Sequence, residues 1–294
     1  RRARMAVFLV FGASGAIGRF LLPRLLDAGH DVFAVSREAR MACHPGLRWV
    51  VGDLSGDTPA PPDSAAIFSL GPLDAFADWF ARSRVEGRPR IVAIGSLSAK
   101  TKAASKDPRE RALADRLLRA ERTLAAAAEA RGSVATILRA SLIYGAGLDR
   151  SLTPIAEFAR RWRVFPYAPG ARGLRQPVHA DDLAAACVAL ASSPSAGGTY
   201  DVGGGERLAF ATMLARVRTS LPFATLALPI PFMIARAGLG LARQLPAFRA
   251  ASASALQRTN EDLVVDHAAA AADFGWSPRD FRPDASTWTP PPLP

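Results

Sequence analysis

The hydrophobic positions near the start of the chain follow two different periods in succession. An unbroken apolar run covers Ala6–Phe11, apolar residues then recur at helical spacing from Ile17 to Leu26, and Gly29 follows. A second apolar run extends from Asp31 to Val35. A short continuous run is typical of a buried strand, and recurrence every three or four residues is typical of a helix that packs on one side. This stretch therefore predicts a β-α-β unit.

The same alternation continues along the first half. We expect further strands that end near Asp53, Gly71, Ser96 and Ala140, and helices over 74–84 and 108–131. Strands that alternate with helices predict an α/β fold with a doubly wound parallel sheet, which binds its ligands at the carboxyl ends of the strands. We expect a core over residues 1–145 and a smaller substrate-facing lobe over 146–294, with some elements that return to the core. The proline-rich tail near 285–294 is expected to be disordered.

Three glycines lie in the turn of the first unit. A first glycine permits a tight turn, a second lets the backbone approach a pyrophosphate, and a third allows close packing of helix on strand. The N-terminus of the following helix offers free N–H groups to phosphates. The pattern predicts a Rossmann-type dinucleotide site. The alternative is a glycine-rich turn with a purely structural role. The candidate contacts are Gly12, Ser14, Gly15, Ala16, Ile17 and Gly18.

The end of the second strand bears on the choice of cofactor. An NAD site usually places a carboxylate there, whereas the 2′-phosphate of NADP calls for a cation. The chain has Ser36 and Arg37 at this point, followed by Glu38. The pattern favours NADP(H) over NAD(H), and the alternative is that Arg37 is a solvated residue at a strand end.

The amino-acid composition limits which classes of protein and partner fit this chain. The 294 residues are 49% hydrophobic and 21% charged, as expected for a soluble globular protein. The formal charge of +11 raises the question of a nucleic acid, but the arginines are spread along the whole chain and no nucleic-acid-binding module can be read. Two distant cysteines match no metal or redox spacing, and we expect no metal. The start resembles no secretory signal, so a cytoplasmic protein is expected.

The motifs "GASGAIGR", "GDL", "IGSLS", "LRASLIYG" and "RQPVHADDLA" occur in an order and spacing that resemble the short-chain dehydrogenase/reductase superfamily, in its extended, nucleotide-sugar-epimerase-like branch. The resemblance implies that Asp53, with Leu54 beside it, contacts the adenine and that Gly71 passes the cofactor backbone. It also implies that Ser96 lies near the nicotinamide. A homodimer is left open, because members often pair through the helix that corresponds to Leu113–Leu124.

One departure from this family concerns its catalytic tyrosine and lysine. If Glu121 occupies the place of the family's glutamate that follows the lysine, the tyrosine and lysine positions fall on Leu113 and Leu117. Neither leucine can exchange a proton, and no tyrosine of the chain precedes a lysine at that spacing. The sequence therefore resembles members that lack the pair.

All three lysines of the chain lie in one loop after the fifth strand, at positions 100, 102 and 106. A cation at this edge of the sheet could stabilise an oxyanion or act as an acid with a lowered pKa. Lys102 is the candidate, with Ser96, Ser98 and Tyr144 as hydroxyl partners. The alternatives are a solvated loop and a packing role for Tyr144.

The second half supplies candidate substrate contacts, Arg175 and His179. Residues 221–245 form the most apolar section, which several prolines interrupt, so a spanning helix is not expected. Core packing or a dimer surface is the main interpretation of this section, and a peripheral membrane contact is the alternative.

Three functions remain open. The first is an NADPH-dependent oxidoreductase of a small carbonyl or enone substrate. The second is a non-catalytic NADP-binding structural or sensor protein. The third and weaker one is a nucleotide-sugar epimerase or dehydratase.

Overall fold

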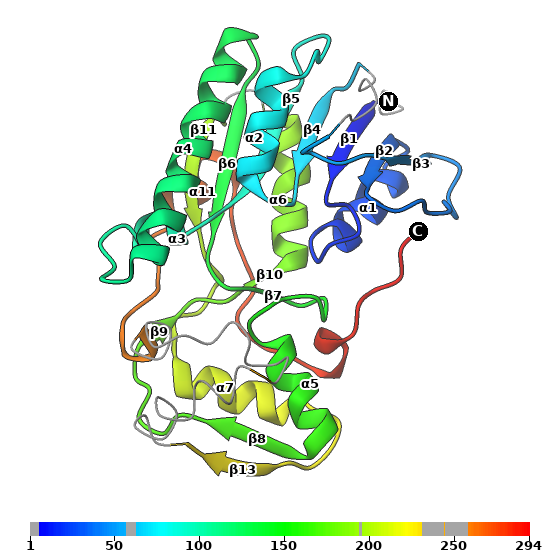
Figure 1. Ribbon diagram of the computed structural model, residues 1–294. Helices are drawn as coiled ribbons and strands as arrows, with labels where there is room; N and C mark the ends of the chain where they lie inside the picture. Colours follow the sequence, from blue (N-terminus) through cyan, green and yellow to red (C-terminus); the bar gives the residue numbers. More distant parts are fainter. Residues whose placement is uncertain (1–5, 57–62, 194–195, 231–243, 245–257) are drawn as a thin grey trace.

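A computed structural model describes residues 6–56, 63–193, 196–230, 244 and 258–294. Its centre is a sheet of seven parallel strands in the order β11-β6-β5-β4-β1-β2-β3 (Figure 1). The strands are β1 (Val7–Phe11), β2 (Asp31–Ser36), β3 (Leu47–Val51), β4 (Ala66–Ser69), β5 (Arg90–Ser96), β6 (Ala135–Ala140) and β11 (Gly198–Val202). The predicted doubly wound α/β fold is confirmed.

Helices cover both faces of this sheet. Helices α1 (Gly18–Asp27) and α6 (Ala180–Ser192) pack together on one face, and α2 (Leu73–Arg82) and α4 (Pro108–Ala130) pack together on the other. The leucines of α1 and the aromatic residues of α2 are buried against alternate residues of β1, because successive strand residues point to opposite faces. The sequence therefore buries one apolar stripe of each helix.

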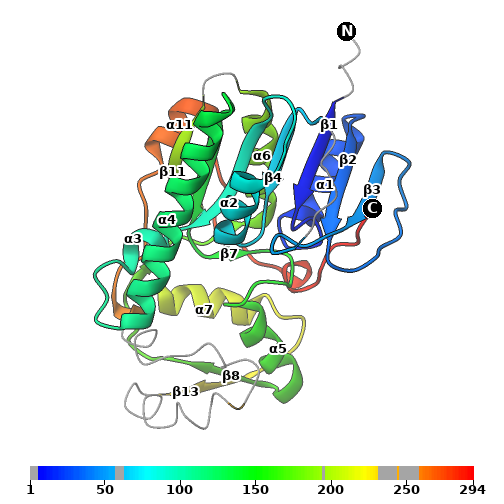
Figure 2. The same cartoon turned by 45° about the horizontal axis from the view of Figure 1, so that its top comes forward.

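The second lobe lies beyond the carboxyl ends of the strands (Figures 1 and 2). Its own core includes Phe165, Met213 and Phe281. Its elements are α5 (Thr153–Trp162), β8 (Val164–Tyr167), β9 (Leu174–Arg175), β12 (Leu208–Ala209), α7 (Phe210–Thr219) and β13 (Leu226–Pro229). The short ribbon of β7 (Ile143–Tyr144) and β10 (Val178–His179) lies between this lobe and the sheet.

Several elements of the second half return to the core. Strand β11 adds the outer edge next to β6, and α6 and α11 (Ala268–Phe274) pack beside it. The tail differs from the disorder that its prolines predict. It contains a short 3₁₀-helix, η3 (Ala285–Trp288), capped by Asp284, and the carbonyl of Pro291 accepts a hydrogen bond from Arg19. Leu293 packs on the core.

Another short 3₁₀-helix, η2 (Arg258–Asn260), precedes α11. Of the apolar section 221–245, residues 231–243 and 245 lie outside the described residues. Among the helices that are described, none is long and apolar enough to cross a membrane.

Candidate active site

The glycine turn joins β1 to α1, and its glycines meet steric limits. Gly12 has a φ of 76°, and a Cβ atom there would lie 3.0 Å from the backbone nitrogen of Gly71. A Cβ atom on Gly18 would lie 2.1 Å from the carbonyl oxygen of Ala13. Only glycine tolerates both the positive φ and the close approach. The turn is thereby held against the end of β4, where Gly71 was predicted to pass the cofactor.

The N-terminus of α1 is open toward the same turn. No side chain caps it, and its first turn carries no acidic residue. A ten-residue helix whose start has neither a side-chain cap nor an acidic residue favours an anion such as a pyrophosphate. Ser14, Ala16 and Ile17 lie in this turn, as the sequence predicts for cofactor contacts. These residues fit the diphosphate of a nicotinamide dinucleotide.

The end of β2 is more basic than the sequence motif suggests. Ser36 is buried, and its hydroxyl accepts a hydrogen bond of 3.2 Å from Nε of Arg40. Arg40 also pairs with Glu38 at 3.4 Å and lies over the ring of Trp49. Arg37 is exposed beside them. Sequence reasoning missed Arg40, because its position four residues past Ser36 belongs to no motif.

The remaining adenine-side candidates follow β3. The carboxylate of Asp53 is exposed and accepts a hydrogen bond from the N–H of Ser55 at 3.1 Å. Leu54 packs against the core, and its carbonyl accepts a hydrogen bond from Arg82 at 2.6 Å. Both residues follow a strand whose neighbour is β2, so they lie at the same edge of the sheet as Ser36.

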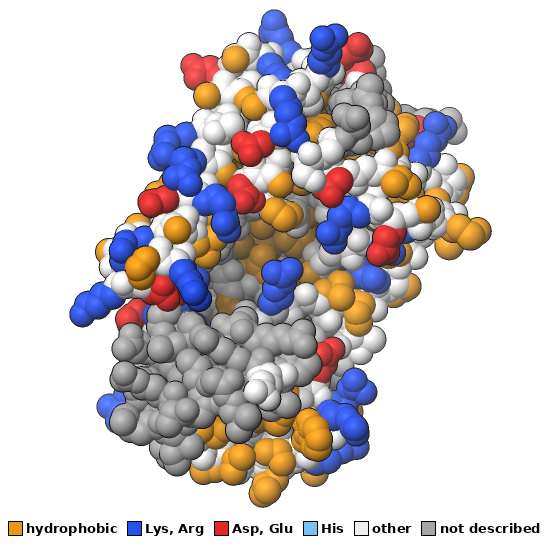
Figure 3. Space-filling view, in the orientation of Figure 1, with side chains coloured by type: hydrophobic (Ala, Val, Ile, Leu, Met, Phe, Trp, Pro, Cys, Tyr) orange, Lys and Arg blue, Asp and Glu red, His pale blue; other side chains and the backbone are white. Residues whose placement is uncertain are grey.

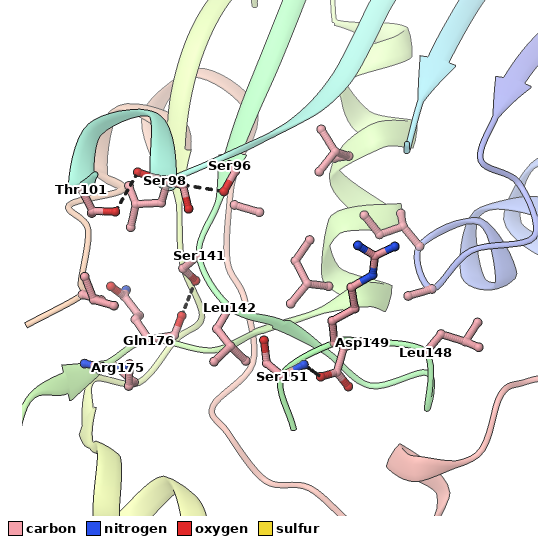
Figure 4. A pocket seen from close by; sticks show the side chains of 18 of the residues that line it. Ser96, Ser98, Thr101, Ser141, Leu142, Leu148, Asp149, Ser151, Arg175 and Gln176 are labelled. Atoms are coloured by element: carbon pink, nitrogen blue, oxygen red, sulfur yellow. Dashed lines mark hydrogen bonds between the residues drawn. The ribbon is translucent and has the colours of Figure 1, made fainter. Parts of the chain in front are cut away.

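A cavity of about 660 Å³, here called the central cavity, lies between the sheet and the second lobe (Figure 4). It brings together Ala16 and Ile17 of the glycine turn, Ser96 and Ser98 after β5, and residues of the second lobe. These groups are distant in sequence and meet because the carboxyl ends of parallel strands share one edge. The cavity is large enough for a small molecule.

Several polar groups at the central cavity are bound to other parts of the protein. Arg175 is 5% exposed, and its guanidinium donates to the carbonyls of Leu174, Glu261 and Arg258. Burial lowers its pKa. The side-chain amide of Gln176 donates a hydrogen bond to the carbonyl of Gly204 and accepts one from the N–H of Val265. The predicted substrate residue Arg175 thus joins the second lobe to η2.

Asp149 serves the fold in a similar way. Its carboxylate accepts hydrogen bonds from the N–H groups of Ser151 and Leu152 and from Thr153, at the start of α5. The next residue, Arg150, is exposed at the cavity, and no hydrogen bond or ion pair of its side chain is found among the described residues. Sequence reasoning missed Arg150, since one arginine among many carries no signal.

The serine candidates lie on the opposite side of the central cavity. Ser96 ends β5, and its oxygen accepts a hydrogen bond of 3.2 Å from the N–H of Ser98 (Figure 4). Ser98 and Thr101 begin and end the short helix α3 (Ser98–Thr101), where Thr101 donates to the carbonyl of Leu97. The predicted Ser96 and Ser98 therefore lie together at the cavity wall.

The side chains of Lys100 and Lys102 form ion pairs with carboxylates. Lys102 lies 3.8 Å from Glu110, which also pairs with Arg258, and it is not among the residues that line the central cavity. Burial and the nearby Arg258 lower the pKa of Lys102. Lys100 pairs with Asp201 at 2.5 Å, and Lys106 is exposed.

Tyr144 and His179 lie together at a separate cavity of about 500 Å³, beside the C-terminal tail. Tyr144 is 1% exposed and contacts the rings of His179 and Phe281 edge-on. Burial raises its pKa. His179 caps α6 by accepting a hydrogen bond from the N–H of Asp181 at 3.1 Å, and burial lowers its pKa. Asp181 and Asp182, in the first turn of α6, form ion pairs with Arg24 and Arg279.

Leu113 and Leu117 are half-buried on α4 and do not line the central cavity. The neighbouring Glu121 forms a two-pronged pair with Arg139 of β6, at 2.7 and 2.5 Å. Ionic contacts between helix and strand thus occur one turn away from the leucines.

The fold and the glycine turn define a nicotinamide-dinucleotide-binding protein. The sequence profile described as "NAD dependent epimerase/dehydratase family" matches residues 8–60 and 114–203. This match is consistent with the extended, epimerase/dehydratase-like branch of the short-chain dehydrogenase/reductase superfamily that the motifs of the chain resemble. The unmatched interval 61–113 contains the lysine loop and Leu113.

Solved structures share the whole fold. UDP-glucuronic acid 4-epimerase from Bacillus cereus, in complex with NAD, superposes with a TM-score of 0.70 at 11% identity, and covers 96% of this chain and 97% of its own. The enzyme WbmG of Bordetella bronchiseptica, in complex with NAD, gives 0.66 at 13% identity, over 98% and 93%. MoeE5 in complex with UDP-glucose and NAD gives 0.67 at 20% identity, over 96% of each chain. A search of the curated proteins finds no match.

Proposed function

We propose that the protein is an NADP(H)-dependent oxidoreductase that reduces a carbonyl or enone group of a small anionic substrate. The observation that carries the proposal is the central cavity, which is lined both by the glycine turn and by the second lobe. A protein that only bound a dinucleotide at the glycine turn would not need a cavity that continues from this turn to the second lobe.

The cofactor would be held by the glycine turn at its diphosphate and by the end of β2 at its ribose. Ser36, Arg37 and Arg40 offer a hydroxyl and two guanidinium groups, which suit a 2′-phosphate better than a free hydroxyl. Glu38 is already engaged with Arg40. The chemistry that bound NADPH supplies is hydride donation to carbon.

Ser96 and Ser98 take the part of hydrogen-bond donors to the carbonyl oxygen. The oxygen of Ser96 accepts from the N–H of Ser98, so the proton of Ser96 is free to point at a ligand in the cavity. Such a donor stabilises negative charge as it develops on the oxygen. Water in the cavity then delivers the proton, because neither Leu113 nor Leu117 can do so. Hydride and proton together convert C=O to CH–OH.

Arg150 supports an anionic substrate. Charged residues at the central cavity are Asp149, Arg150 and Arg175, and only Arg150 is without a partner among the described residues. A carboxylate or phosphate on the substrate would compensate its charge. UDP-glucose, which MoeE5 binds, is one compound of this class to include in a test.

The test is NADPH oxidation against small carbonyls, enones and UDP-sugars, each with and without an anionic group. We expect turnover with an anionic substrate, a loss of kcat of tenfold or more in Ser96→Ala, and a KM about tenfold higher in Arg150→Ala. The exposed Arg172, in the same lobe but outside the cavity lining, is the matched control, and its alanine variant should stay within about twofold of wild type.

A non-catalytic NADP-binding protein is the second candidate. Two observations favour it, the leucines at the family's catalytic positions and the ion pairs that engage Lys100 and Lys102. Tight NADPH binding without oxidation on any substrate, in the wild type, would establish this candidate and refute the oxidoreductase. Epimerase chemistry would show instead as conversion of a UDP-sugar with no net oxidation of the cofactor.

A further inference from the structure

The end of the second lobe carries an exposed apolar surface. Trp162 is 57% exposed, Leu226 69% and Leu228 45%, and these are three of the seven large hydrophobic residues exposed in the described part of the chain. In Figure 3 hydrophobic side chains gather along the lower edge of the molecule, where Figure 1 places β8 and β13. We call these three residues, with their strand neighbours Val164 and Pro166, the lobe-end surface.

The pairing of β8 with β13 explains why the four strand residues of this surface share a face. Leu226 lies opposite Val164 and Leu228 opposite Pro166, and paired residues point to the same side of a sheet. Phe165, between them in β8, is 1% exposed and packs in the core of the lobe. One face of the ribbon is therefore used for folding, and the other is apolar and carries the exposed Leu226 and Leu228.

Arginines surround this surface. Residues 153–167 and 218–230 contain four arginines, Arg160, Arg161, Arg163 and Arg218, all exposed, and one acidic residue, Glu157. Arg161 lies 5.4 Å over the ring of Trp162, and the carbonyl of Arg163 accepts a hydrogen bond from the N–H of Leu226. Figure 3 shows basic side chains beside the apolar ones at this end of the molecule.

We propose that the lobe-end surface docks on an anionic lipid membrane. Tryptophan is favoured at the boundary between headgroups and acyl chains, and arginine can rest its stem on apolar surface while its charge faces the headgroups. Anionic headgroups would compensate the four arginines. A second copy of the chain would instead bring the same arginines toward one another across a symmetric contact, which is unfavourable.

The test uses the full chain in flotation with vesicles of phosphatidylcholine alone or mixed two to one with phosphatidylglycerol. We expect flotation only with the mixed vesicles, and loss of it at high salt, since exposed charges are screened. The variant Leu226→Glu/Leu228→Glu should abolish binding. The variant Arg160→Gln/Arg161→Gln should weaken the partition coefficient about tenfold or more.

The matched control is Arg119→Gln/Arg122→Gln, which removes the same charge from the exposed surface of α4. It should bind vesicles as wild type does. Equal loss in both arginine variants would overturn the proposal, because binding would then follow from the overall charge of +11. Absence of wild-type flotation would overturn it too, and a dimer that Leu226→Glu/Leu228→Glu dissociates would assign the surface to a second copy. Retained NADPH binding by Leu226→Glu/Leu228→Glu shows that this variant is folded. If it does not fold, the comparison of the two arginine variants decides whether the lobe-end surface binds the membrane.

Discussion

The pair between Glu121 and Arg139 joins α4 to β6 next to the site where the family's catalytic pair is missing. Glu121 is 6% exposed, and both of its oxygens accept hydrogen bonds from Arg139. Arg139 also lies 3.5 Å from Asp201, which binds Lys100 at 2.5 Å. A Glu121→Gln substitution keeps the shape of the side chain but removes the charge that compensates Arg139.

The size of the effect follows from burial. Loss of one partner of a buried ion pair destabilises a protein by about 3–5 kcal/mol, because the other charge stays buried without compensation. Asp201 remains near Arg139, and the Arg139 side chain is 14% exposed, so both water and a second carboxylate reduce the effect. We expect the free energy of unfolding to fall by about 2–3 kcal/mol, which is at or just below the lower limit of that range.

Urea unfolding followed by circular dichroism measures this difference. Glu129→Gln, at an exposed position on the same helix, is the control and should change the free energy of unfolding by about 0.5 kcal/mol or less. Replacement of both partners, by Glu121→Leu with Arg139→Met, should recover most of the loss, since neither charge of the pair is then left buried without the other, and Asp201 keeps Lys100 as its partner. If Glu121→Gln has the same free energy of unfolding as the Glu129→Gln control, the pair does not hold α4 on the sheet and the reasoning is refuted.

Three further predictions concern the cofactor and the candidate tyrosine. Arg40→Ala should weaken NADPH binding about tenfold and leave NADH within about twofold in a fluorescence titration, whereas Arg48→Ala, at an exposed position of β3, should change neither; equal losses for both cofactors would contradict a 2′-phosphate contact. Gly18→Ala should lower the melting temperature and abolish dinucleotide binding, because its Cβ atom would lie 2.1 Å from the carbonyl of Ala13, and wild-type affinity in this variant would show that the turn can shift. Tyr144→Phe should keep kcat within about twofold, because the ring is buried between His179 and Phe281, and a large loss of kcat with an unchanged melting temperature would instead make the hydroxyl catalytic.

Short runs of apolar residues in the sequence predicted the strands of the sheet. The apolar runs of β1, β2, β4 and β5 are each bounded by polar or glycine residues, and burial on both faces of a parallel sheet requires such runs. The predicted helix over 108–131 ends one residue earlier, at Ala130. The tail was predicted less well, because proline content says nothing about a single distant partner such as Arg19.

Candidate site residues were predictable where the backbone alone fixes their place. The glycine turn and Ser96 follow directly from strand ends, so their meeting at one edge follows from the fold. The positions of Lys100 and Lys102 could not be predicted in this way. Each side chain turns toward a carboxylate that lies elsewhere in the sequence, Asp201 and Glu110, and such pairing depends on side-chain directions that no period encodes.

The ion pairs of the lysines and the leucines of α4 together define what the site can do. Lys100 and Lys102 each lie beside a carboxylate, and proton transfer from either to a ligand in the central cavity would first require that pair to open. Leu113 and Leu117 provide no acid. The polar groups at the cavity include the hydroxyls of Ser96 and Ser98 and the exposed guanidinium of Arg150. These groups bind and polarise a substrate, but they include no tyrosine activated by a lysine. Any reduction at this site should therefore show a flat rate profile between about pH 6 and pH 9, where a tyrosine activated by a lysine would produce a step.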